Sequence, residues 1–249
     1  ARYAGKKILD IYNLGVAGAD VQYKDDNSPL TAADLASNRA ITKSLSDLTP
    51  EIPILSEEGT KISFNERSSW NRFWLIDPLD GTKEFVKRNG EFTVNIALIE
   101  NSKPILGVVY APVLDILWFG DSNGSFKDEK GRQKRSISVS LDNSEYPVRV
   151  VVSRSHISAG IEKFINQFQN YSILQMGSSI KMCLVADGSA DIYPRLGPTM
   201  EWDTAASHAI INNAGGSIKS TETGNDLVYN KKDLHNPWFI ANSNIDYLL

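Results

Sequence analysis

Residues 91–119 carry the pattern that constrains the fold most. Their sequence, EFTVNIALIENSKPILGVVYAPVLDILWF, alternates, turns at Asn101-Ser102-Lys103-Pro104 and then alternates again. A period of two places successive side chains on opposite faces of a strand, and short polar turns join such strands into hairpins. The segment therefore predicts successive antiparallel strands, and GSFKDEKGRQKR after it predicts another hairpin with a charged turn.

The pattern changes after residues 140–147, SLDNSEYP, a polar stretch that is the best candidate for a linker. Beyond it, strand and helix patterns alternate in the order VRVVVS, residues 160–168, YSILQMG, SSIKMCLVADG, ADIYPR and WDTAASHAIINNAGG. Such alternation is typical of α/β domains. We therefore expect an α+β domain over residues 1–146 and an α/β domain over residues 147–249, which makes the chain an α/β protein.

Upstream of the antiparallel strands, the predicted elements are shorter. Helical spacing covers residues 2–14 and 31–48, and the apolar runs EIPIL (51–55) and FWLI (73–76) predict short strands that end in acidic residues. The polar segment between the acidic motifs, residues 57–73, predicts a loop.

Composition excludes several classes of function. With a net charge of −4 and no dense run of Lys or Arg, nucleic-acid binding is disfavoured as the main function. Cys183 is the only cysteine, which excludes an intrachain disulfide framework and a cysteine-based zinc site and is typical of a reducing compartment. No run of 18 apolar residues predicts a transmembrane segment. We expect a cytoplasmic monomer or homodimer, with peripheral association with the inner face of the membrane left open.

Acidic residues gather in four short stretches: TAAD (31–34), LSEEG (55–59), IDPLDGT (76–82) and EWDTAAS (201–207). The second and third directly follow apolar runs, so Glu57 and Asp77 should lie at strand ends, where open sheets bind ligands. Pro78 favours an extended Asp77, and the turn after it lets Asp77 and Asp80 point into one space.

Two carboxylates that close repel each other unless a cation lies between them. The candidate ligands are all oxygens, with no His or Cys nearby, which favours Mg²⁺, Mn²⁺ or Ca²⁺ over zinc. An EF-hand is excluded because counting back from Gly81 puts Ile76 at the first loop position. A phosphatase with an aspartyl nucleophile is excluded because Leu79, not an acid, stands two residues after Asp77.

The step Gly81-Thr82 predicts an anion site beside these carboxylates. If GTKEF opens a helical turn, its free N–H groups point outward, Gly lets a phosphate approach the backbone, and the Thr82 hydroxyl can carry a proton. Cations next to an anion cradle are what metal-assisted hydrolysis of a phosphate ester requires.

Each stretch taken alone has a simpler interpretation that is better than even. DPLDG is a common turn sequence, SEEG is typical of a solvated loop, and Asp34 and Asp203 are typical of helix starts. The prediction of a phosphate site therefore depends on the four stretches occurring together.

Three of these segments, WLIDPLDGTKEF, LSEEG and EWDTAAS, resemble the signatures of the inositol monophosphatase-like superfamily of Mg²⁺-dependent, lithium-sensitive phosphatases. Within it, KDDNSPLTAAD, DGTKEFVKRNGEFTVNIALI, PILGVVYAPV and GSSIKMCLVADGSADIYPR are most similar to the bacterial 3′(2′),5′-bisphosphate nucleotidases. The resemblance covers nearly the whole chain and implies a layered αβαβα sandwich. It also implies hydrolysis of adenosine 3′,5′-bisphosphate to AMP and phosphate.

The resemblance also implies roles for individual residues. Two or three Mg²⁺ ions are expected, and five positions supply their ligands: Glu57, Asp77, Leu79 through its carbonyl, Asp80 and Asp203. Thr82 and Asp34 are the pair that activates the attacking water, the N–H groups of Gly81 and Thr82 hold the phosphate, and Glu58 supports the metal ligands through water.

Four further residues are implied to contact the nucleotide and its second phosphate: His156, Ser178, Lys181 and Arg195. A helix start with Lys and Arg nearby suits a second phosphate. The simpler interpretations are that Ser178 caps its helix, Lys181 lies on a solvated face, Arg195 is a surface charge and His156 is structural. His208, on the helix after Asp203, predicts packing rather than chemistry.

The implied function is removal of the 3′-phosphate from the nucleotide by-product of sulfate activation. One alternative is an inositol or sugar-phosphate monophosphatase that shares the metal site. Lys181 and Arg195 discriminate between them, because a monophosphate has no second phosphate for these cations. The other alternative is a non-enzymatic accessory or scaffold protein with the same fold.

Overall fold

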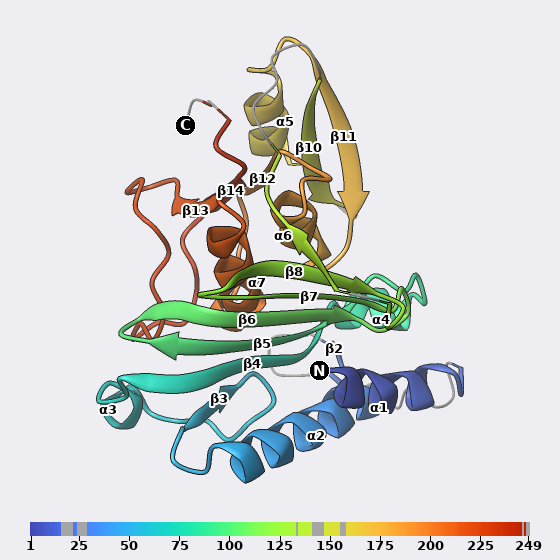
Figure 1. Cartoon of the computed structure of the whole chain (residues 1–249), viewed down its shortest axis with the longest axis vertical. Helices are drawn as coiled ribbons and strands as arrows, with labels where there is room; N and C mark the ends of the chain where they lie inside the picture. Colours follow the sequence, from blue (N-terminus) through green and yellow to red (C-terminus); the bar gives the residue numbers. More distant parts are fainter. Residues whose placement is uncertain are drawn as a thin grey trace.

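Two large β-sheets and three layers of helices alternate along the long axis of the molecule (Figure 1). The computed structural model describes residues 1–15, 22–23, 29–132, 134–140, 147–154, 158–245 and 247. The predicted boundary between residues 146 and 147 lies at the end of the undescribed segment 141–146, so it stays a prediction.

The first sheet has seven strands in the order β3-β4-β5-β6-β7-β8-β9. Their bounds are Ile54–Ser56 (β3), Arg72–Asp80 (β4), Thr93–Glu100 (β5), Lys103–Ala111 (β6), Ile116–Asp121 (β7), Gly124–Glu129 (β8) and Arg135–Ile137 (β9). β3 runs parallel to β4, and every other pair is antiparallel. The antiparallel strands predicted from residues 91–119 and the hairpin after them are confirmed. A separate pair joins β1 (Gln22–Tyr23) and β2 (Pro29–Leu30).

The second sheet is mixed, with five strands in the order β11-β10-β12-β14-β13. Their bounds are Val148–Ser153 (β10), Tyr171–Met176 (β11), Ile192–Arg195 (β12), Ser217–Ser220 (β13) and Phe239–Asn242 (β14). β10 is parallel to β11 and β12, whereas β14 is antiparallel to β12 and β13. The sequence did not predict β13 and β14. All four residues of β14 are buried, so its side chains show no alternation of period two.

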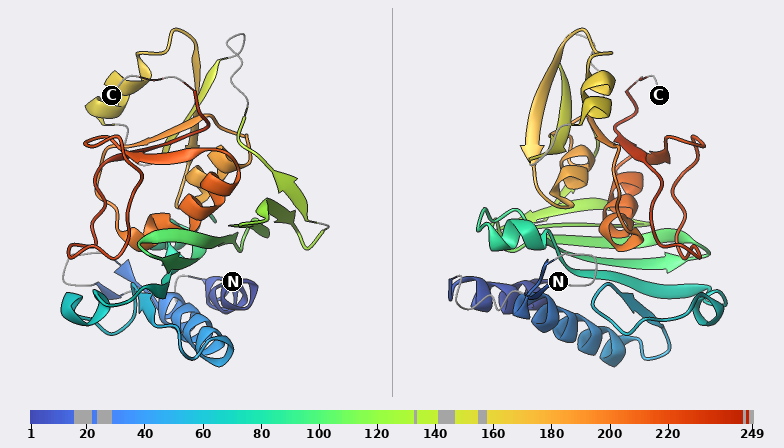
Figure 2. Two further views of the ribbon diagram at one scale, coloured as in Figure 1. Left: turned by 60° about the vertical axis from the view of Figure 1, so that its left-hand side comes forward. Right: turned by 180° about the vertical axis from the view of Figure 1, so that it is seen from behind.

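The helices are α1 (Arg2–Tyr12), α2 (Ala32–Leu48), α3 (Phe64–Arg67), α4 (Thr82–Val86), α5 (Ala159–Ile165), α6 (Ile180–Ala186) and α7 (Glu201–Asn213). α1 and α2 cover the outer face of the first sheet, α6 and α7 lie between the sheets, and α5 covers the second sheet (Figures 1 and 2). The predicted αβαβα sandwich is therefore confirmed. The predicted loop over residues 57–73 needs correction, because it contains α3 and because its last two residues, Arg72 and Phe73, belong to β4. Ser63 is the N-cap of α3, and its hydroxyl accepts the N–H of Glu66.

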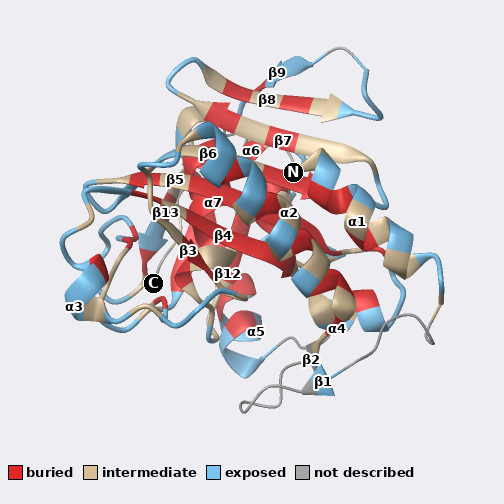
Figure 3. Ribbon diagram, turned by 90° about the horizontal axis from the view of Figure 1, so that it is seen from below, coloured by how far each residue is buried: buried red, intermediate tan, exposed pale blue. Residues whose placement is uncertain are grey.

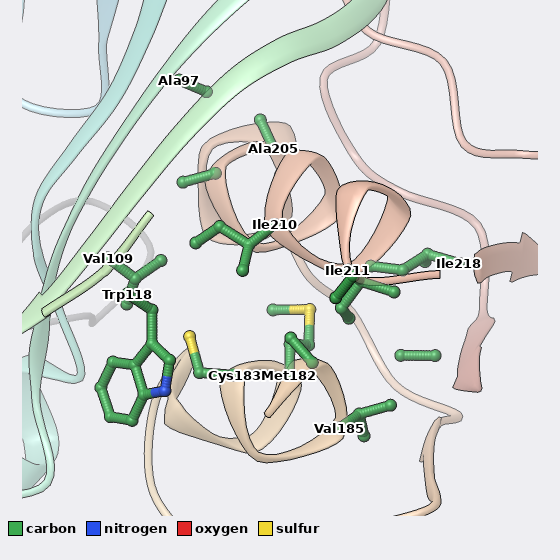
Figure 4. Close-up of a cluster of buried hydrophobic side chains, with 14 of the residues drawn as sticks. Ala97, Val109, Trp118, Met182, Cys183, Val185, Ala205, Ile210, Ile211 and Ile218 are labelled. Atoms are coloured by element: carbon green, nitrogen blue, oxygen red, sulfur yellow. The ribbon is translucent and has the colours of Figure 1, made fainter. Parts of the chain in front are cut away.

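The main hydrophobic core lies between the two sheets. Figure 4 shows Trp118 of the first sheet beside Cys183 of α6 and Ile210 of α7, and all three are at most 1% exposed. A second core lies under α1 and α2, where β4 and β5 are largely buried (Figure 3). α7 thus packs on the first sheet on one side and on α6 and β13 on the other, which fixes its position relative to both sheets.

Close packing of α7 on β6 predicts a large effect of one added methyl group. A Cβ at Gly107 would lie 2.0 Å from the carbonyl oxygen of Ala206, a backbone atom that cannot rotate away. We expect Gly107→Ala to lower the free energy of unfolding by about 3 kcal/mol, the upper end of the usual range for overpacking. Urea unfolding measures this change.

Gly160→Ala is the matched control. Gly160 lies in α5, where an added Cβ would meet the side chains of Leu196 at 3.5 Å and Ser158 at 3.8 Å, both ordinary contacts. Because Ala is the better helix former, this control should leave stability unchanged or raise it slightly. Equal unfolding midpoints for the two variants would contradict the close approach of α7 to β6.

Candidate active site

The acidic turn lies where β4 leaves its neighbour. The register of β4 on β5 shifts between Asp77 and Asp80, and the N–H of Leu79 donates to Asp77 Oδ1 at 3.0 Å. Gly81 then takes a left-handed conformation (φ 92°), and α4 begins at the next residue. The turn interpretation of DPLDG is therefore correct, and this turn is what brings the two aspartates together.

Three carboxylates meet at this turn. Asp77, Asp80 and Asp203 can each offer one oxygen within 4.8 Å of the others. Asp203 reaches them from the first turn of α7, where its Oδ2 also accepts the N–H of Met200 at 2.9 Å. The helix-start interpretation of Asp203 and its predicted place beside Asp77 and Asp80 are both correct.

The electrostatics of the cluster favour a cation. Burial, then repulsion by Asp80, raises the pKa of Asp203 to about 8. Burial, then repulsion by Glu57, raises the pKa of Asp77 well above its usual range. A divalent cation would offset this repulsion, and carboxylate oxygens are the ligands that hard cations prefer. The cluster can therefore hold a metal ion.

Glu57 lies beside these carboxylates, since its N–H donates to the carbonyl of Ile76 at 3.2 Å. Glu58 follows it, and its charge contributes to raising the pKa of Asp34. The structure thus places Glu57 next to the cluster and Glu58 close to Asp34.

Thr82 and Asp34 form a contact between α4 and α2. The Thr82 hydroxyl lies 3.2 Å from Asp34 Oδ1 and 3.3 Å from the carbonyl oxygen of Leu79. The other Asp34 oxygen accepts the N–H of Thr31 at 2.8 Å and its hydroxyl at 2.5 Å, which makes a capping box at the start of α2. Burial, the largest effect, raises the pKa of Asp34 to about 6. Asp34 therefore caps the start of α2 and holds Thr82 at the same time.

A cavity of about 370 Å³ opens beside the cluster. Its lining includes Asp80, Gly81 and Asp203, and also three of the four residues implied to contact the nucleotide: Ser178, Lys181 and Arg195. The fourth, His156, lies outside the described residues. Lys83 and Arg154 line the cavity too, so four cations surround a space that two of the carboxylates border.

Lys181 and Arg195 are not simple surface charges. Lys181 is only 6% exposed, and its ammonium donates to the carbonyl of Ser178 at 2.6 Å, so the simpler interpretation that it lies on a solvated face is wrong. Arg195 is half-buried, and one of its terminal nitrogens donates to the carbonyl of Pro198 at 2.7 Å. Its Nε is buried without a hydrogen-bond partner in the part of the chain that the structure describes. Both cations therefore have donors held at the cavity by packing.

Ser178 is not the cap of α6, because Ser179 occupies that position. The Ser178 hydroxyl lies 2.7 Å from Asp80 Oδ2 instead. Sequence reasoning missed Ser179 itself and two buried partners in β5, Thr93 and Asn95. Their signal was present in FTVNIALI, where Thr93 and Asn95 are polar at alternate positions of an apolar strand.

His208 packs in the interior, as predicted. It is 1% exposed, its Nδ1 lies 2.8 Å from the Tyr229 hydroxyl, and burial lowers its pKa to about 4. It therefore stays neutral at physiological pH.

Comparison with known proteins places this site in a family. The chain matches the Inositol monophosphatase family over residues 1–245. The chain belongs to the inositol monophosphatase family. A protein named 3′(2′),5′-bisphosphate nucleotidase CysQ from Escherichia coli (strain K12) is 46% identical over 240 residues, which is 96% of this chain and 95% of that protein.

Solved structures in the inositol monophosphatase family have the same fold. The crystal structure of CysQ from Bacteroides thetaiotaomicron is 41% identical, with a TM-score of 0.85, and the match covers 98% of this chain and 94% of that one. SuhB from Bartonella henselae is 26% identical, with a TM-score of 0.80 over 98% and 91% of the two chains. The predicted family is confirmed. No helix among the described residues is long and apolar enough to cross a membrane.

The raised pKa of Asp203 predicts how stability depends on pH without a cation. A carboxyl whose pKa rises from 3.8 to about 8 on folding stabilises the folded state fully below about pH 4, and this contribution is lost as the pH rises towards 8. We therefore expect the Tm of EDTA-treated protein to fall between about pH 5 and pH 8. Added Mg²⁺ should raise the Tm more at the higher pH, because cation binding then needs no deprotonation. Differential scanning fluorimetry measures both effects.

Asp203→Asn is the control, since it keeps the size of the side chain and removes the titrating group. The fall in Tm with pH should be smaller in this variant than in the parent. If Mg²⁺ raised the Tm of the parent protein equally at both pH values, this would contradict the repulsion between Asp203 and the neighbouring carboxylates.

Proposed function

We propose that this protein is a Mg²⁺-dependent 3′(2′),5′-bisphosphate nucleotidase that converts adenosine 3′,5′-bisphosphate to AMP and phosphate. The observation that carries the proposal is the shared cavity, in which Asp80 and Asp203 lie together with the buried Lys181 and the half-buried Arg195. One phosphate would bind to the metal ions held by the carboxylate cluster. The second phosphate would bind to the two basic side chains. Relatives named for this activity support the substrate class.

We assign two or three Mg²⁺ ions to five ligands: Glu57, Asp77, the carbonyl of Leu79, Asp80 and Asp203. When bound, such ions acidify an attacking water and stabilise the leaving ester oxygen. The protein supplies the geometry for this chemistry, because Asp77 is oriented by the N–H of Leu79 and Asp203 by the N–H of Met200. Glu58 is assigned a supporting role through water.

Thr82 and Asp34 are assigned the proton transfer. The Thr82 hydroxyl donates its proton to Asp34 Oδ1. A lone pair of the Thr82 oxygen is then left to accept a proton from the attacking water. With a pKa of about 6, Asp34 is mostly ionised at neutral pH and yet basic enough to receive that proton. The pair can thus pass one proton from water to a carboxylate.

The start of α4 is assigned to hold the transferred phosphate. The first hydrogen bond of this helix runs from the N–H of Phe85 to the carbonyl of Gly81, so the N–H groups of Gly81 and Thr82 are not used within the helix. Ser178, Lys181, Arg195 and His156 are assigned to the nucleotide and its other phosphate. We also place the enzyme in the cytoplasm, as a monomer or homodimer, where it would clear the nucleotide by-product of sulfate activation.

Phosphate release tests the substrate. We expect the protein to hydrolyse adenosine 3′,5′-bisphosphate well, to hydrolyse inositol 1-phosphate poorly, and to lose both activities without Mg²⁺. Asp80→Asn should lower kcat by orders of magnitude with the fold unchanged, because it removes a ligating charge. Preference for the inositol ester would favour the monophosphatase alternative. Near-normal turnover of Asp80→Asn would contradict the metal site, and no activity on either ester would favour the scaffold alternative.

Lys181→Ala tests the second phosphate. Because its ammonium is held at the cavity and a charged hydrogen bond contributes about 1.5–3 kcal/mol, we expect kcat/KM for the bisphosphate to fall roughly 10- to 100-fold. Hydrolysis of adenosine 3′-monophosphate should change much less. Steady-state kinetics on both substrates measure the difference.

Lys163→Ala is the matched control, since Lys163 is an exposed lysine of α5 that does not line this cavity. It should leave both substrates unaffected. An equal loss on the bisphosphate and the monophosphate in Lys181→Ala would refute the role in binding the second phosphate.

A further inference from the structure

We propose that Ser179, oriented by Asn95, is a positioning residue that holds Asp80 ready to bind a cation and so leaves the neighbouring Ser178 for the substrate. The inference deepens the proposed function and rests on its metal site, but not on the identity of the substrate.

Donors on one side of Asp80 converge on a single oxygen. Asp80 Oδ2 accepts the Ser179 N–H at 2.7 Å and the Ser179 hydroxyl at 2.6 Å, and it lies 2.7 Å from the Ser178 hydroxyl. Hydrogen bonds to a charged acceptor are short and strong, so they fix the direction of the carboxylate. Asp80 Oδ1 is then the oxygen left for a cation, so Asp80 binds a cation through this one oxygen.

Asn95 fixes the proton of Ser179. The Asn95 amide is 1% exposed, and its Nδ2 donates to the Ser179 hydroxyl oxygen at 2.8 Å. The Thr93 hydroxyl lies 2.9 Å from the other end of this amide, Asn95 Oδ1, which sets which end faces Ser179. Because the Ser179 oxygen already accepts a proton from Asn95, its own proton must point to Asp80 or to the Asp203 carbonyl, 2.8 Å away.

The Ser178 hydroxyl is not tied to a single hydrogen-bond partner. Its hydroxyl has one proton and lies 2.7 Å from both Asp80 Oδ2 and the Thr93 hydroxyl. Both serines line the cavity, but Ser178 is half-buried whereas Ser179 is 1% exposed. If Ser178 turns its proton to a phosphate, Asp80 still keeps the N–H of Ser179, and Asn95 still directs the Ser179 proton towards Asp80 Oδ2 or the adjacent Asp203 carbonyl. The two adjacent serines can therefore serve different partners at the same time.

The contact also joins the two sheets at the metal site. Asn95 lies in β5 and Asp80 at the end of β4, whereas Ser179 follows β11 and precedes α6. The loop before Ser179 is held as well, because the N–H of Gly177 donates to Glu91 Oε2 at 2.8 Å and a Cβ at Gly177 would lie 2.7 Å from the Glu91 carbonyl oxygen. Asp80 is thus oriented only when both sheets are packed correctly.

Binding of Mn²⁺ alone tests the proposal without any substrate. Free Mn²⁺ is followed by electron paramagnetic resonance in the whole protein. We expect Ser179→Ala to weaken Mn²⁺ binding about 10- to 100-fold, the usual effect of losing a group that orients a metal ligand. Asn95→Ala should weaken it in the same direction. The double variant should bind no more weakly than Ser179→Ala, because both substitutions break one chain of hydrogen bonds.

Two serines serve as controls. Ser178→Ala should change Mn²⁺ binding by a few-fold at most and should raise the KM for the bisphosphate. Ser125→Ala removes another buried serine, whose hydroxyl donates to the carbonyl of Ile210 at 2.6 Å. It should lower the Tm in EDTA and leave Mn²⁺ binding unchanged, which separates a structural loss from a loss of positioning.

The outcomes are distinct. Ser179→Ala that is folded and binds Mn²⁺ as tightly as the parent would overturn the proposal and leave the nucleotidase function standing. Equal weakening in Ser178→Ala and Ser179→Ala, or additive losses in the double variant, would overturn the division between the two serines. A parent protein that binds no Mn²⁺ would overturn both this proposal and the metal site. Preference for the inositol ester would refute only the assigned substrate.

Discussion

Repulsion among buried carboxylates is the constraint on which the site depends. Asp77, Asp80 and Asp203 come from two chain segments more than a hundred residues apart, and the fold holds them together against their mutual charge. Packing of the surrounding layers offsets this repulsion in the cation-free protein. The repulsion, together with burial, raises the pKa values of Asp77 and Asp203. A cation converts the same arrangement from a destabilising into a stabilising one.

α7 is the element that makes this arrangement rigid. The helix contacts five strands of the first sheet, β4 to β8, and also α6 and β13, so its first turn can hold Asp203 at a fixed place beside β4. Gly107 allows the helix backbone to approach β6 closely, and small residues such as Ala205 and Ala206 face the core. The position of Asp203 is therefore set by packing along a helix of 13 residues rather than by the loop before it.

Sequence reasoning succeeded where the pattern is local. The antiparallel strands could be predicted from alternation, and the acidic turn from Pro78 and Gly81, because backbone geometry there depends on the residues themselves. It failed where tertiary packing decides. β14 is buried on both faces and shows no period, and Lys181 is buried because an adjacent carbonyl and a Tyr193 ring surround it. Ser179 was missed because its partners, Asp80 and Asn95, are both more than 80 residues away in the chain.

Three of the predicted site residues also have a structural task, and this explains why three of the four acidic stretches had an adequate simpler interpretation. Asp34 caps α2 through Thr31, Asp203 caps α7 through Met200, and Asp77 closes its own turn through Leu79. These bonds use one carboxylate oxygen and leave the other for chemistry. A carboxylate that is already held by its own backbone needs little further ordering when a ligand arrives. The structural and the chemical interpretations of the acidic residues are thus two uses of the same side chains, one on each oxygen.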